Sequence, residues 1–173
     1  PPDPQAGKPL FVEKCAPCHG ELGSGRGSRA SEMGSSAAAL ALPEISRPAT
    51  PAAWYTLVTK GDLERSMPPF NGLTDRQRWD VVAYALTLSE SAEDLATGET
   101  LYQSNCASCH GEQGKGDGSA AANLSTSPSN FTDQAFMAER SGEDLYQVIA
   151  NGKGTMPAFA ARFSEEERRF LAS

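Results

Sequence analysis

The sequence predicts an all-α fold made of two small helical domains in tandem. A repeat is the first observation: the pentapeptide Cys-Ala-Pro-Cys-His at 15–19 recurs as Cys-Ala-Ser-Cys-His at 106–110. Apolar residues around both copies recur at helical spacing, and no segment near them reads as a strand. The length of 173 residues suits two small domains. We therefore predict domains over 1–88 and 98–173, joined by a linker over 89–97.

The first predicted helix of each domain leads directly into the pentapeptide. It runs from Gly7 to about Cys15 in the first copy, because Leu10, Phe11 and Cys15 lie on one broad apolar face. The segment before Cys106 has the same pattern of apolar residues. Both helices should therefore carry the pentapeptide at their C-terminal ends.

A second helix is predicted in each domain after a loop rich in alanine, serine and proline. It begins near Thr50, with Pro51 at the first helical position, and ends at Gly61. Its counterpart runs from Ser141 to Gly152. The offset between the copies falls from 91 at the pentapeptides to 89 further along, so the second copy lacks two loop residues.

The last helix of each domain has a start signal in the sequence. Thr74 begins the helix that runs to about Leu88, and Ser164 begins the other, with glutamates at 165–167 near the positive end of the helix dipole. Only about ten residues of the second helix precede Ser173, so we expect it to be truncated relative to a longer parent protein.

The chemistry of the pentapeptides points to covalent haem. In C-x-x-C-H, helical spacing puts two thiols one turn apart, where both can bond to the vinyl groups of one haem while the imidazole reaches the iron. The two copies use every cysteine and every histidine of the chain. We predict two haem c groups, anchored by Cys15, Cys18, Cys106 and Cys109 and ligated by His19 and His110.

Three other kinds of site fit these motifs less well. Structural zinc sites typically close over roughly 15–20 residues between cysteine pairs, whereas 87 residues separate Cys18 from Cys106. A thioredoxin-like dithiol needs a neighbouring strand and a single C-x-x-C. The glycine-rich segments 20–27 and 111–118 lack the strand and the G-K-[ST] helix start of a phosphate-binding loop, so we interpret them as haem-edge loops.

No histidine of the chain is left over for the distal side of either iron, which leaves methionine, lysine, another weak ligand, water or no ligand there. Met67 and Met156 occupy equivalent places, each followed by proline and, three residues on, by phenylalanine. We predict that they are the distal ligands; a thioether favours Fe(II) and raises the reduction potential. Met33 has no counterpart and is expected at the surface or haem edge, whereas Met137 is expected in the core.

The charge is uneven along the chain, whose net charge is −7. Residues 1–90 carry 9 basic and 10 acidic side chains, and residues 91–173 carry 6 and 12. This balance excludes a nucleic-acid partner, which needs a basic stripe. The acidic second domain could dock a redox protein through that protein's basic patch. Alternatively, acids such as those at 165–167 only solvate the start of a helix.

The sequence contains no apolar run long enough to span a membrane and no signal segment at its start. Because thioether haem is attached outside the cytoplasm, we expect a periplasmic or otherwise extracytoplasmic bacterial location. Any membrane association would come from a missing segment of a membrane-tethered parent or from a partner.

Together these motifs resemble the class I cytochromes c, and specifically tandem dihaem members such as cytochrome c4. The resemblance covers residues 7–173 and rests on the pentapeptides, the helices before them, the glycine-rich loops and the Met-Pro motifs. The sequence is also similar to dihaem segments fused to bacterial membrane proteins, including some of the iron-permease family.

The resemblance implies a compact helical fold in each domain, with terminal helices that cross beside the haem. It also implies the ligand set already named, with the four cysteines as anchors, the two histidines proximal and the two methionines distal. Such proteins usually have a proline whose carbonyl orients the proximal imidazole. This chain has Ser28 and Ser119 there, and their carbonyls could take the role.

One-electron transfer between redox partners is the leading functional hypothesis, since the sequence offers no acid/base set and no catalytic residue. The alternatives are a dihaem oxidoreductase with an open iron site, and an electron-delivery or redox-sensing module of a larger membrane-bound protein. Domains this small bury little surface, so we also expect each domain to fold poorly without its haem.

Overall fold

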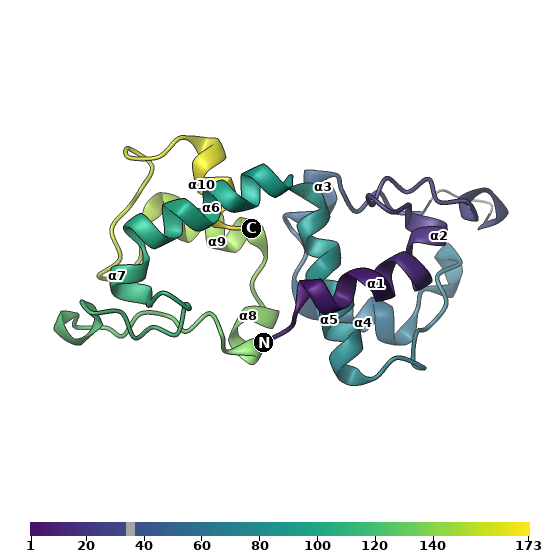
Figure 1. Ribbon diagram of the computed structural model, residues 1–173, viewed down its shortest axis with the longest axis horizontal. Coiled ribbons are helices and arrows are strands. Elements are labelled where there is room, and N and C mark those ends of the chain that lie inside the picture. The colour runs from purple at the N-terminus through teal and green to yellow at the C-terminus, as the bar shows by residue number, and fades with distance from the viewer. Residues whose placement is uncertain (34–36) are drawn as a thin grey trace. The chain divides into compact units, whose positions relative to one another are not determined.

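The computed structural model describes residues 1–33 and 37–173, which divide into two compact units. The first unit spans Pro2–Ser89 and the second Glu90–Ser173 (Figure 1). Helices are the only extended regular elements among the described residues, where β-pairing is limited to two isolated bridges. The prediction of an all-α fold is therefore confirmed.

The two units repeat the same succession of helices. The first unit contains α1 (Pro4–Lys14), α2 (Ala16–His19), α3 (Pro43–Ser46), α4 (Pro51–Lys60) and α5 (Asp75–Leu86). The second unit contains α6 (Ala92–Asn105), α7 (Ala107–His110), α8 (Gln134–Ala138), α9 (Gly142–Asn151) and α10 (Glu165–Leu171). Short 3-10 turns lie at Ala30–Met33, Leu63–Arg65, Thr87–Ser89 and Ala121–Asn123. No helix within the described ranges is long and apolar enough to cross a membrane.

Hydroxyl caps set the starts of the later helices. The Thr74 hydroxyl accepts a hydrogen bond from the Gln77 N–H, while the Gln77 amide oxygen accepts one from the Thr74 N–H. The helices that follow Ser141 and Ser164 begin with the same reciprocal pair. The predicted starts of α5, α9 and α10 are confirmed because such caps can be recognised in sequence.

The first helix of each unit begins earlier than the sequence analysis expects. Ser91 caps α6 through a reciprocal pair with Asp94, so most of the predicted linker 89–97 is helical. Asp3 caps α1, whose first residue is Pro4. Both helices therefore have extra N-terminal turns that the apolar pattern alone does not reveal.

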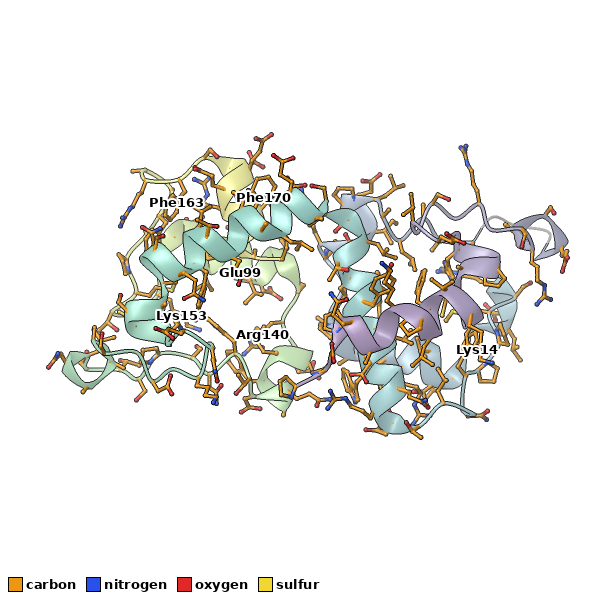
Figure 2. The ribbon with its side chains drawn as sticks, in the orientation of Figure 1. Lys14, Glu99, Arg140, Lys153, Phe163 and Phe170 are labelled. Carbon is orange, nitrogen blue, oxygen red and sulfur yellow. The ribbon has the colours of Figure 1, made fainter. Side chains whose placement is uncertain are left out.

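Each unit is built on a close crossing of its first and last long helices. In the first unit α1 lies across α5 (Figure 1), and a Cβ added to Gly7 would lie 1.9 Å from the backbone oxygen of Asp80. In the second unit α6 crosses α10, and a Cβ on Gly98 would lie 2.3 Å from the backbone oxygen of Phe170, labelled beside α6 in Figure 2. Only a residue without a Cβ permits either approach.

The buried core is small in both units and smaller in the second. In the first unit Phe11 and Val81 are each 1% exposed, and the Phe11 ring meets that of Tyr84 edge-on at 5.3 Å. The first cluster of buried residues comprises Phe11, Cys15, Ala16, Leu73, Val81 and Ala85. The second comprises Tyr146, Ala150 and Ala172. Cores of this size are typical of domains that a cofactor completes.

Candidate functional site

Both pentapeptides form a short helix directly after the first helix of their unit. In α2 the N–H of His19 donates to the backbone oxygen of Cys15 at 2.9 Å, and in α7 His110 repeats the bond to Cys106 at 2.8 Å. Each motif thus occupies a single helical turn, as its spacing predicts, with the two cysteines and the histidine brought together.

The glycine-rich loops close over the pentapeptides. Gly25 donates its N–H to the backbone oxygen of His19 at 2.7 Å, and Gly27 donates to that of Cys18 at 3.0 Å. Gly116 and Gly118 make the same two bonds to the second motif, at 2.8 and 3.1 Å. A Cβ on Gly27 would lie 2.3 Å from backbone oxygens of α2, so only glycine fits at this position. These loops therefore cap the carbonyl ends of α2 and α7.

One nitrogen of each imidazole is held by a backbone carbonyl. Nδ1 of His19 lies 2.9 Å from the oxygen of Ala38, and Nδ1 of His110 lies 3.3 Å from the oxygen of Ser129. A histidine that donates Nδ1–H to a carbonyl leaves the Nε2 lone pair available for a metal. Both rings are therefore prepared to act as Nε2 ligands.

The family resemblance suggests that the backbone carbonyls of Ser28 and Ser119 orient the proximal histidines. The structure does not bear this out. The accepting residues, Ala38 and Ser129, instead lie 19 positions after each histidine. A backbone carbonyl gives no signal in residue type, because every residue has one. Which carbonyl lies beside the histidine depends on the path of the long loop between the two residues.

Each methionine lies at the end of a tight turn that an isolated bridge closes. Met67 and Asp62 exchange two backbone hydrogen bonds of 2.8 Å, and Met156 and Lys153 exchange two of 3.0 Å. Four residues connect the bridged pair in the first unit and two in the second. The two residues that the second copy lacks are therefore missing from this turn.

The methionine loops are also tied to the helices that precede them. The N–H of Phe70 donates to the backbone oxygen of Val58 at 2.9 Å, and that of Phe159 donates to Ile149 at 3.0 Å. Both methionines are half-buried. The repeated Met-Pro-x-Phe pattern thus places two methionines equivalently in two copies of one loop.

The other two methionines have no such placement. Met137 lies half-buried in α8, whereas the side chain of Met33, expected at the surface or haem edge, is outside the described part of the structure.

The leading cysteine of each motif is held as a neutral thiol. Burial, and then the neighbouring Cys18 thiol, raise the pKa of Cys15 to about 12. Burial, followed by Cys109, also raises the pKa of Cys106. Zinc binding and disulfide exchange both require a thiolate. The raised pKa values of Cys15 and Cys106 therefore oppose a reactive dithiol.

The residues present fit a covalent haem in each unit. Two thiols one turn apart precede an imidazole whose Nε2 is available, and a second loop carries a methionine. Among the described residues, no three histidine, cysteine, aspartate or glutamate side chains gather as a site for a bare metal ion. Thiols, imidazole and thioether are the donors that hold a haem c and its iron.

Replacing Cys106 and Cys109 with alanine is expected to leave one haem per chain and to unfold the second unit. The buried cluster of that unit has three members, too few to replace the cofactor's contribution. Haem content by pyridine haemochrome and helix content by circular dichroism measure the two effects. Cys15→Ala with Cys18→Ala is the matched control, for which we expect a smaller loss of helix because five other members of the first cluster remain. Equal helix content in the parent protein and in both double variants would contradict a cofactor-dependent fold.

The comparisons with known proteins agree with this geometry. Residues 2–84 and 93–173 each match the family described as cytochrome c oxidase, cbb3-type, subunit III. The cbb3-type cytochrome c oxidase subunit CcoP of Azospirillum brasilense is 28% identical over 188 residues, covering 96% of this chain and 59% of the relative. The FixP subunit of Azorhizobium caulinodans is 30% identical over 168 residues, covering 91% and 54%.

A third relative is shorter and matches part of the chain. Chloroplastic cytochrome c6 of Chlamydomonas reinhardtii is 40% identical over 89 residues, which cover 49% of this chain and 54% of that protein. This chain spans 59% and 54% of the two oxidase-subunit relatives. The predictions of tandem cytochrome c domains and of covalent haem c are confirmed. The chain belongs to the family of cbb3-type cytochrome c oxidase subunit III, with two cytochrome c domains in tandem and a covalent haem c in each.

Proposed function

We propose that this chain relays single electrons from a donor protein toward an oxidase and performs no catalysis of its own. A haem bound in each unit supplies an iron that gains and loses one electron at a time. The relatives named as cbb3-type oxidase subunits support an oxidase as the acceptor. Since such proteins have longer chains than this one, the relay would act as the extracytoplasmic, periplasmic part of a larger assembly.

The ligand assignment is part of the proposal. The thiols of each pentapeptide would hold the porphyrin, the histidine would bind iron through Nε2, and the methionine of the bridged turn would bind from the opposite side. The residues so assigned are Cys15, Cys18, His19 and Met67 in the first unit, and Cys109, Cys106, His110 and Met156 in the second.

The observation that carries the proposal is the repetition of one hydrogen-bonded site in both units. Each histidine ring is held by a backbone carbonyl, and the backbone of each methionine is held by a two-bond bridge. Ligands fixed on both sides of an iron leave no coordination position for a substrate and limit rearrangement when its charge changes. This favours a carrier over a dihaem oxidoreductase with an open iron.

A docking partner with a basic patch is also proposed for the second unit. The acids at the start of α10 contribute little, since Glu167 caps the helix and Glu165 lies 3.8 Å from Arg169. Other acids of the unit are exposed on α6 and in the loop after α7, among them Glu93, Glu99 and Glu112. These would steer a positive partner at low ionic strength.

Spectroscopy of the haem-loaded chain tests the relay. We expect two reversible one-electron steps, low-spin spectra in both oxidation states, and no rapid carbon monoxide binding by the ferrous protein at neutral pH. A high-spin ferric iron or ready carbon monoxide binding would instead support the oxidoreductase. Electron transfer to a cbb3-type oxidase, faster at low salt than at high salt, is the expected partner result.

A further inference from the structure

The proximal sides of the two sites differ in one aromatic residue. The ring of Phe131 stacks on the imidazole of His110, with centroids 4.7 Å apart and planes inclined by 15°. Phe131 also meets Tyr102 edge-on at 6.5 Å. The Tyr102 hydroxyl donates to the backbone oxygen of Gly111, just after the histidine, at 2.7 Å. Phe131 is thus in contact with two other rings.

The first unit has a leucine at the corresponding place. Leu40 and Phe131 each lie two residues after the carbonyl that accepts from the proximal histidine. A Cβ built on Gly23 would lie 3.4 Å from the Cβ of Leu40, and one on Gly114 would lie 3.3 Å from that of Phe131. The segment 37–42 contains only alanine and leucine, so it offers no ring to the first imidazole.

We propose that Phe131 is a positioning residue for His110 and raises the reduction potential of the second haem above that of the first. The inference rests on the histidine ligation proposed above. It concerns the residues around the His110 imidazole, which the proposed electron relay does not specify.

The hydrogen bond of each imidazole supports this order. A strong bond from Nδ1–H makes Nε2 a better electron donor, which favours Fe(III). The bond is 2.9 Å at His19 and 3.3 Å at His110, so the first site stabilises Fe(III) more.

The stacked ring acts in the same direction. Phe131 covers one face of the imidazole and excludes water from it. Fe(III) carries one more positive charge than Fe(II), and an apolar shell that excludes solvent disfavours that charge. The aromatic face therefore raises the potential of the second site beyond the effect of the longer hydrogen bond.

Net charge opposes this order but acts from farther away. The second half of the chain has the larger excess of acidic side chains, which favours Fe(III) there. Many of these acids are exposed, and salt screens exposed charges over about 8 Å at physiological ionic strength. The contacts at the imidazole are closer and do not depend on long-range charge, so they should prevail, most clearly at high salt.

Reciprocal exchange of the two residues tests the inference in the haem-loaded chain. Phe131→Leu gives the second site the residue of the first and preserves apolar packing, whereas Leu40→Phe does the reverse. Phe131→Tyr keeps the stacked ring as a control. Spectroelectrochemical titration at high ionic strength measures both midpoint potentials, and Met156→Ala identifies the second haem. Low-temperature electron paramagnetic resonance reports the orientation and strength of the axial ligands.

We expect Phe131→Leu to shift the second midpoint downward, to leave the first in place and to change the ferric signal of the second haem. Phe131→Tyr should keep the original midpoint, and Leu40→Phe should raise the first. Two low-spin haems with unchanged midpoints in both exchanges would overturn the inference while leaving the relay intact. A second haem that is the lower of the two at high salt would also overturn it. If the Phe131→Leu variant does not fold, the midpoint of the first haem in Leu40→Phe decides whether the inference holds.

Discussion

The Gly7→Ala and Gly98→Ala variants are each expected to lose about 3 kcal/mol of stability in their own unit, which corresponds to melting roughly 12–24 °C lower. The added Cβ would lie 1.9 Å from the Asp80 oxygen or 2.3 Å from the Phe170 oxygen. Both obstacles are backbone atoms of a helix, so relief requires the crossing helices to separate. Helix propensity alone predicts the opposite sign, since alanine is better than glycine by about 1 kcal/mol.

Gly72→Ala is the matched control for this experiment. A Cβ at Gly72 would meet nothing within 4 Å, and the residue is not in the left-handed region. We expect it to match or slightly exceed the parent in melting temperature, because alanine restricts the unfolded chain. Thermal unfolding of the haem-loaded proteins, followed by circular dichroism, gives the comparison. A Gly7→Ala variant as stable as Gly72→Ala would show that the crossing is looser than described.

Met67→Ala and Met156→Ala are each expected to lower the potential of one haem on the order of 0.2 V, within the roughly 0.8 V that axial ligands span. Under the proposed ligation, loss of the thioether removes the ligand that favours Fe(II) and opens a position for water. Each variant should also acquire one high-spin ferric signal and bind carbon monoxide at one iron per chain. Potentiometric titration and absorption spectra measure both effects.

Met137→Leu controls for the general effect of removing a methionine. Its side chain lies in α8, outside the bridged turns, and leucine conserves its volume. Both potentials should stay at their original values. If Met67→Ala and Met156→Ala behaved like Met137→Leu, the distal ligands would have to be sought elsewhere in the chain.

Features encoded by residue type were predictable from the sequence. Thr74 and Ser164 mark the starts of α5 and α10 because a hydroxyl cap depends on the side chain itself. Ser91 marks the start of α6 in the same way, but the serine and acidic residues of that segment read as a linker. Capping side chains therefore predicted the starts of α5 and α10. The cap at Ser91 was missed because it lies within the segment expected to be a linker.

Features that depend on long-range approach were not predictable. The sequence contains both Gly7 and Gly98, yet only the crossing helices show which backbone each one meets. The carbonyls of Ala38 and Ser129 each lie 19 positions after the histidine that they contact. A stacking partner such as Phe131 likewise becomes recognisable only when the loop is placed. The sequence repeat located the two haem sites, whereas the residues that surround each histidine could be identified only from the tertiary structure.

The length of the turn before each methionine has a kinetic consequence under the proposed ligation. A connection of four residues loses more backbone freedom on closing than a connection of two, so the longer turn should open more readily. The longer turn also holds Ser66 in the left-handed region at φ 59°, a strain that Gly154 avoids in the shorter one. Met67 should therefore leave its iron more often than Met156. A small exogenous ligand such as cyanide should capture the first iron sooner than the second.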